Sequence, residues 1–125
     1  MTWRAFALAA LLAATPLQAD PVPAKARVEI VSLLAQLAES GCQFKRNGVW
    51  HEAAQARAHL QRKFDYLAEK DAVNSAEQFI ERAATRSSMT GQAYWVRCGD
   101  RAAVPSGTWL TNLLRGMRTQ AAPSP

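Results

Sequence analysis

The sequence contains only two histidines and two cysteines in 125 residues, and this scarcity limits the sites it can build. His51 and His59 are separated by about 80° of rotation and ~12 Å of rise on an α-helix, so their rings do not reach one metal ion. His51-Glu52 resembles the start of a zinc-protease helix, but Gln55 stands where the second histidine ligand is required. We therefore expect no metal site and no cofactor.

Motifs for an activated serine are missing as well. The sequence has no G-x-S-x-G, no serine with lysine three residues later, and no lysine before Thr90-Gly91 to complete a K-T-G box. Folding can still bring Ser87 or Ser88 to His59, which leaves open a small envelope hydrolase with His59 as general base and Ser88 as nucleophile. Loop serines more often cap turns, and this favours a protein that is not an enzyme.

Long apolar runs are absent except at the amino terminus. Residues 5–14 form one run of ten after Arg4, followed by Thr15-Pro16 and a small residue at Ala19. The run is too short to cross a bilayer and predicts a signal peptide, residues 1–19, cleaved after Ala19. The alternative is an uncleaved membrane anchor. We expect a periplasmic or secreted protein with no transmembrane span after cleavage.

The chain left after cleavage, about 106 residues, is long enough for one small domain and too short for separate cofactor and substrate domains. We place this domain at residues 20–118 and a disordered tail at 119–125. The net charge of +5 falls to +4 without Arg4. Basic and acidic residues alternate along the sequence, which is typical of a solvated surface and not of a nucleic-acid reader. A weak, salt-sensitive attraction to anionic envelope polymers or lipids remains open.

The two cysteines have one possible intramolecular pairing. In an oxidising compartment we expect Cys42 and Cys98 to form a structural disulfide. The bridge closes a loop of about 57 residues, for which chain entropy predicts about 4 kcal/mol of stabilisation. A redox role is disfavoured because the cysteines are not in a C-x-x-C turn.

The hydrophobic pattern predicts a mainly α domain of about four helices, with a short hairpin or turn and one short strand. Asn47-Gly48 indicates the tight turn, and Tyr94-Trp95-Val96 the strand. Helices are expected at residues 24–40, at 51–69, from a cap at Asn74 to about Thr85, and after Pro105-Ser106-Gly107. Their apolar stripes are Ile30, Val31, Leu34, Leu37 and Ala38; Trp50, Ala53, Ala54, Leu60, Phe64 and Leu67; Ala76, Phe79, Ile80, Ala83 and Ala84; and Trp109, Leu110, Leu113, Leu114 and Met117.

Polar residues at helical spacing and a hydroxyl-rich loop suggest a binding site. His59 and Lys63 share one face of the second helix, and the loop after the third helix can fold over them. Together they predict a site for an anionic or carbonyl-bearing ligand, or for an envelope partner, formed by Arg46, Asn47, His59, Lys63, Ser87, Ser88, Thr90 and Tyr94. A structural accessory that packs on another envelope protein through an exposed tryptophan patch is a third possibility.

Five short phrases in fixed order resemble the YfeK-like family of small exported bacterial proteins. They are Cys42-x-Phe44-x-Arg46-Asn47-Gly48, Ala56-x-x-His59-Leu60-x-x-Lys63, Ala76-Glu77-x-Phe79-Ile80, Ser87-Ser88-x-Thr90-Gly91-x-x-Tyr94 and Trp109-Leu110. The chain departs from the pattern at Trp50, where an aromatic Tyr is usual, and at Ala93, where Pro is common. The resemblance implies export to the periplasm and leaves the function open, because the family is of unknown function.

Overall fold

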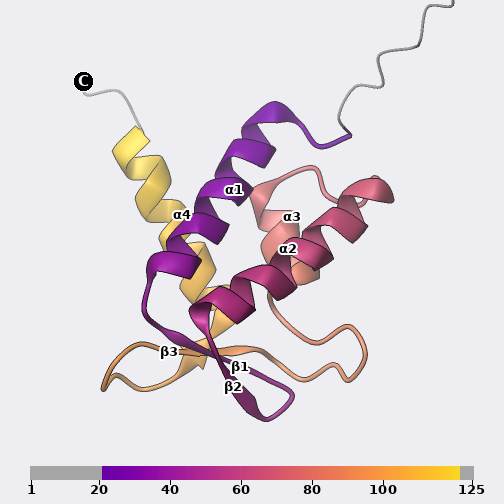
Figure 1. The fold of residues 1–125 in the computed structure, drawn as a ribbon. Helices are drawn as coiled ribbons and strands as arrows, with labels where there is room; N and C mark the ends of the chain where they lie inside the picture. Colours follow the sequence, from indigo (N-terminus) through magenta and orange to yellow (C-terminus); the bar gives the residue numbers. More distant parts are fainter. Residues whose placement is uncertain (1–20, 122–125) are drawn as a thin grey trace, which may run out of the picture.

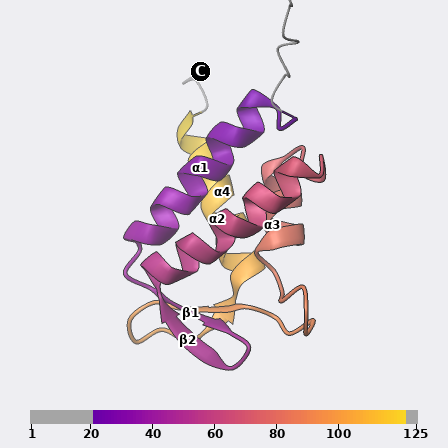
Figure 2. The same cartoon turned by 45° about the vertical axis from the view of Figure 1, so that its right-hand side comes forward.

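The computed structural model describes residues 21–121, and in this part of the chain four helices lie on one side of a four-stranded sheet (Figures 1 and 2). The predicted signal segment and residues 122–125 lie outside the described residues. Residues 119–121, which we assigned to the tail, belong to the last helix. The elements are α1 (Ala24–Glu39), β1 (Gln43–Arg46), β2 (Val49–Glu52), α2 (Ala53–Glu69), α3 (Ala76–Ala83), β3 (Trp95–Arg97), β4 (Val104–Pro105) and α4 (Ser106–Ala121).

The prediction of a mainly α fold was wrong, because the strands assemble into an antiparallel sheet of order β2-β1-β3-β4. The fold is therefore mixed. The hairpin and one later strand were both expected, but no pairing between them was predicted. Local patterns indicate that a segment is extended and do not indicate its partner, and β1 pairs with β3 across about 50 residues of intervening chain.

The turn between β1 and β2 explains where the hairpin's side chains point. Asn47 and Gly48 both have positive φ, at 49° and 82°, which matches the right-handed twist of a two-residue hairpin. This turn pairs Arg46 with Val49 and Phe44 with His51. Since side chains alternate along a strand, Phe44, Arg46 and His51 share the sheet face that lies against the helices. His51 is thus a strand residue, and α2 begins at Ala53, two residues later than predicted.

The disulfide between Cys42 and Cys98 is confirmed. Each cysteine lies one residue beyond the paired ends of β1 and β3, where Gln43 is opposite Arg97. Their Cα atoms are 4.3 Å apart and their sulfurs 2.04 Å apart. The bridge therefore joins the two central strands at one end of the sheet.

The core lies between the four helices and the inner face of the sheet. The predicted stripes supply most of it, including Ile30, Leu60 and Phe79, with Phe64 edge-to-face on Phe79. Val31 was expected in the core but is 52% exposed. On α2 the buried alanines are Ala53, Ala56 and Ala68, whereas Ala54 is exposed. None of the helices between residues 21 and 121 is long and apolar enough to cross a membrane.

The cap of α3 lies one residue later than predicted. The Ser75 hydroxyl accepts a hydrogen bond from the backbone N–H of Gln78 at 3.1 Å, and the Gln78 side chain accepts one from the backbone N–H of Asn74 at 2.8 Å. This reciprocal pattern resembles a capping box. Asn74 contributes its backbone and not its side chain, because Ser75 already occupies the cap.

Candidate functional site

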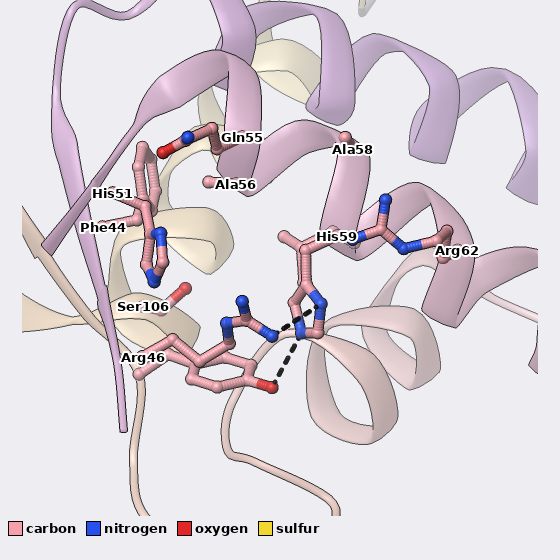
Figure 3. A pocket seen from close by; sticks show the side chains of 11 residues that line it. Phe44, Arg46, His51, Gln55, Ala56, Ala58, His59, Arg62 and Ser106 are labelled. Carbon is pink, nitrogen blue, oxygen red and sulfur yellow. Dashed lines mark hydrogen bonds between the residues drawn. The ribbon is translucent and has the colours of Figure 1, made fainter. Parts of the chain in front are cut away.

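A cleft of about 320 Å³ lies where the β1–β2 hairpin meets the first turns of α2 (Figure 3). The sheet face contributes Arg46 and His51, α2 contributes His59 and Arg62, and the buried Ser106 begins α4. Apolar side chains, together with Gln55 and Tyr94, form the rest of the wall. The complete lining is Phe44, Arg46, His51, Gln55, Ala56, Ala58, His59, Leu60, Arg62, Tyr94 and Ser106.

Four polar side chains from three parts of the chain meet beside this cleft, and three of them, Arg46, His59 and Tyr94, line it. Arg46 Nη1 is 3.2 Å from His59 Nδ1, and His59 Nε2 is 3.2 Å from the Tyr94 hydroxyl (Figure 3). Lys63 Nζ donates to the same hydroxyl at 3.1 Å and to the Arg86 carbonyl at 3.1 Å. The cluster Arg46–His59–Tyr94–Lys63 is therefore one connected hydrogen-bonded group.

Backbone bonds set the position of Tyr94 in this cluster. Its N–H donates to the Thr85 carbonyl and its carbonyl accepts from the Ser106 N–H, both at 2.9 Å. The residue is 6% exposed. The end of the loop after α3 and the start of α4 together hold the phenol against His59.

The donors in the cluster determine the proton positions. A guanidinium carries only donors, so His59 Nδ1 must accept from Arg46 and the neutral ring carries its hydrogen on Nε2. That hydrogen is donated to the Tyr94 oxygen, which also accepts from Lys63. Both acceptor positions of the phenol oxygen are then filled. The Tyr94 hydroxyl hydrogen is left to donate to another acceptor.

Burial and positive charge explain the titration of these groups. Desolvation, followed by the charges of Arg46 and Lys63, lowers the pKa of His59 from 6.5 to about 4, which keeps the ring neutral at pH 7. Burial and Arg46 lower the pKa of Lys63. Burial raises the pKa of Tyr94, and Arg46 opposes this rise. The site therefore disfavours any further positive charge.

A second cleft, of about 410 Å³, lies beside the first. It shares His59 and Arg62 with the first cleft, and adds Lys63, Tyr66, Leu67, Arg82 and Ser88. No aspartate or glutamate of residues 21–121 lines either cleft. The two clefts are therefore lined by cationic side chains and by no carboxylate of the described residues.

The structure brings together only part of the predicted site. Arg46, His59, Lys63 and Tyr94 meet, as just described. Thr90 donates to the Asn47 side chain at 2.7 Å, so this pair ties the loop to the hairpin turn and does not line either cleft. Of the eight predicted residues, four form the hydrogen-bonded cluster and the other four lie outside it.

The two loop serines have different places. Ser87 is buried, and its hydroxyl accepts from the backbone N–H groups of Met89 and Thr90 at 3.3 and 3.2 Å, so it stabilises the turn. Ser88 is exposed and lines the second cleft. Of the two, Ser88 alone is placed to meet a ligand.

Several lining residues escaped the sequence prediction, among them Arg62, His51, Ser106 and Arg82. Arg62 lies one turn after His59 on the same helix, so the three-residue spacing could have indicated that Arg62 shares the site. His51 required the register of the hairpin, which places it opposite Phe44. Ser106 and Arg82 reach the clefts through tertiary packing, and no local pattern indicates them.

Of the three tryptophans in the described part of the chain, Trp50 and Trp95 lie on the outer face of the sheet, on either side of Lys45. Trp95 is 38% exposed. Trp50 lies on the outer face of the sheet with the Arg97 guanidinium 4.2 Å from its ring centre, and Trp109 packs edge-on against Phe44. Between residues 21 and 121 there is also no group of three or more His, Cys, Asp or Glu side chains able to hold a metal ion.

Comparison with known proteins gives a family and no activity. Residues 24–118 match the family of unknown function DUF5329. The chain belongs to this family. An uncharacterized protein, YfeK, from Salmonella typhimurium strain LT2 is 36% identical over 89 residues, which cover 70% of this chain and 72% of the relative. The resemblance to YfeK-like proteins is thus confirmed. No solved structure matches the chain.

Proposed function

We propose that this member of the DUF5329 family is a non-catalytic binding protein of the periplasm, and that it holds an anionic ligand in the cleft between the hairpin and α2. The observation that carries the proposal is the surplus of hydrogen-bond donors around Arg46. The cleft contains two arginines and the Tyr94 hydroxyl, and no carboxylate of the described residues lines it. A ligand rich in acceptors and negative charge complements such a lining.

Arg46 is the anchor of the proposed site. It lies at the end of β1, where it pairs with Val49 of β2, and the preceding residues of β1 also pair with β3, so its backbone is held by the sheet. Its guanidinium donates to His59 and has further N–H groups for a carboxylate or phosphate, which it can meet with two parallel bonds. The neutral His59 supports the guanidinium from one side and adds no charge to the cleft.

The contacts of His59 favour binding over hydrolysis. In a Ser–His pair the ring must accept the serine proton, but His59 Nδ1 accepts from Arg46 and Nε2 is bonded to Tyr94. A pKa of about 4 also makes the ring a weak base at neutral pH. Ser87 is occupied in its turn. A serine hydrolase therefore requires a rearrangement of these contacts.

The sequence and the disulfide support the proposed periplasmic location. The sequence predicts a signal peptide, and the Cys42–Cys98 disulfide suits an oxidising compartment.

The proposal is tested by titrating isotope-labelled mature protein with inorganic phosphate and, separately, acetate. We expect saturable shifts of the NMR signals of Arg46, His59 and Tyr94 with at least one of these anions. Arg46→Gln should weaken this binding by about ten- to a hundredfold, since a charged hydrogen bond contributes about 1.5–3 kcal/mol.

Arg57→Gln is the matched control, because Arg57 is an exposed arginine of α2 that lines neither cleft. It removes the same charge and should change the affinity less than twofold. Equal losses in the two variants, or the absence of saturable shifts with either anion, would refute the site. A fluorophosphonate probe should leave the purified protein unlabelled; labelling at Ser88 would establish the hydrolase instead.

A further inference from the structure

The two clefts form one continuous surface across α2. His59 and Arg62 line both clefts, so these two side chains form the boundary between them. They lie three residues apart on the helix and therefore on the same face. A ligand that fills the first cleft meets the second by passing over Arg62.

Cations lie along this whole path. Arg46 is at its start, the exposed Arg62 stands over its middle, and Lys63 and Arg82 line the second cleft. None of these four cations forms a salt bridge with a carboxylate of the described residues, where Glu29 and Glu77 both bind Arg118. The positive charge of the path is thus not paired within the described part of the chain.

A single small anion at Arg46 leaves most of this charge unpaired. The residues of α2 that line the clefts run from Gln55 to Leu67, which corresponds to a length of roughly 18 Å along the helix axis. Orthophosphate or acetate covers a small part of that length. A chain with several anionic groups can contact Arg46, Arg62 and Arg82 together.

We propose that the natural ligand is an extended polyanion, with phosphate or carboxylate groups repeated along one chain, that runs from the first cleft over Arg62 into the second. This inference rests on the proposed function, because Arg46 remains the anchor. It adds the second cleft as a subsite with Arg82 and Ser88 as its contacts. Several linked anions gain affinity because binding at one subsite raises the effective concentration at the next.

The experiment compares polymers with their monomers on the mature protein. Inorganic polyphosphate is measured against orthophosphate, and polyglutamate against acetate, by calorimetry at several salt concentrations. We expect one polymer to bind at least tenfold more tightly than its monomer, and that polymer identifies the charged group. Its affinity should also fall more steeply with salt, because more ionic contacts form.

Variants separate the subsites. Arg62→Gln and Arg82→Gln should each weaken polymer binding by about five- to tenfold, equivalent to about 1–1.4 kcal/mol. Arg82→Gln should leave monomer binding unchanged, whereas Arg46→Gln should weaken both. Arg82 also donates to the Ala72 carbonyl. Thermal unfolding of the Arg82→Gln protein therefore has to be compared with that of the wild type. Ser88→Ala, which loses no hydrogen bond of the described contacts, is the second variant and should selectively weaken the polymer.

The outcomes distinguish the two proposals. If a monomer binds at Arg46 and neither polymer gains affinity, the polyanion inference is wrong and the anion site stands. If neither monomers nor polymers bind, both are wrong. If Arg57→Gln weakens the polymer as much as Arg82→Gln does, attraction is spread over the surface, and the second cleft is not a subsite.

Discussion

Arg46 donates a hydrogen bond to His59 Nδ1 at 3.2 Å, so a histidine acts as a neutral acceptor beside a permanent cation. On the other side of the ring, Nε2 contacts the Tyr94 hydroxyl, which Lys63 also contacts. A protonated ring would lose the bond from Arg46 and face positive charge on both sides. This relationship makes His59 a reporter for the whole cluster.

We predict that His59 is neutral at pH 7 with its hydrogen on Nε2. Burial and the neighbouring charges lower its pKa to about 4, so an NMR titration should find a midpoint far below 6.5. Nitrogen-15 shifts should identify Nδ1 as the bare nitrogen. Arg46→Gln removes the strongest neighbouring charge and should raise the midpoint. A wild-type midpoint near 6.5 would show that the ring does not lie between the cations.

The same group predicts how stability changes with pH. Because the pKa of His59 in the fold, about 4, lies below its ordinary value of 6.5, the unfolded chain binds more protons between these values. This contribution to stability is complete above pH 6.5 and is lost as the pH falls towards 4. With allowance for solvent screening of a half-buried ring, it is on the order of 1–2 kcal/mol.

Urea unfolding of the wild type and His59→Gln at pH 7 and pH 4.5 isolates this effect. The wild type should lose more stability between the two pH values than the variant does. Circular dichroism at pH 7 verifies that the variant is folded. Identical losses would mean that another group, and not His59, accounts for the acid sensitivity.

The disulfide should make a large contribution to stability. The bridge joins two cysteines that are 56 residues apart in the sequence. Replacing both with serine removes this constraint on the unfolded chain, and chain entropy predicts a loss of up to about 4 kcal/mol in the free energy of unfolding. The measurement is urea unfolding with and without reductant. Reductant should destabilise the wild type and leave Cys42→Ser/Cys98→Ser unchanged. Two reactive thiols in the unreduced, denatured protein would contradict the bridge.

The cap of α3 offers a matched pair of substitutions. Ser75→Ala removes the acceptor for the Gln78 N–H and should cost about 1 kcal/mol of stability. Asn74→Ala keeps the backbone N–H that donates to Gln78 and should cost clearly less. Thermal unfolding compares the two variants. A larger loss for Asn74→Ala would show that Asn74, as the sequence predicted, is the cap and Ser75 is not.

Local chemistry allowed several features to be predicted from the sequence. The Asn47-Gly48 turn follows from the positive φ that these residues tolerate, and the helices follow from apolar spacing. The disulfide followed from having two cysteines and a predicted export signal. Arg46, His59, Lys63 and Tyr94 were named from their side-chain chemistry. Such features depend on a few neighbouring residues or on residue type alone.

Tertiary structure alone decided which of these groups meet. His59 lies 13 residues from Arg46 and 35 from Tyr94, and no periodicity reaches across those separations. The sheet that carries Arg46 forms when β3 pairs with β1, and the hairpin register then places His51 in the cleft. Long-range pairing depends on how the whole core packs, because backbone hydrogen bonds alone do not select one extended segment over another.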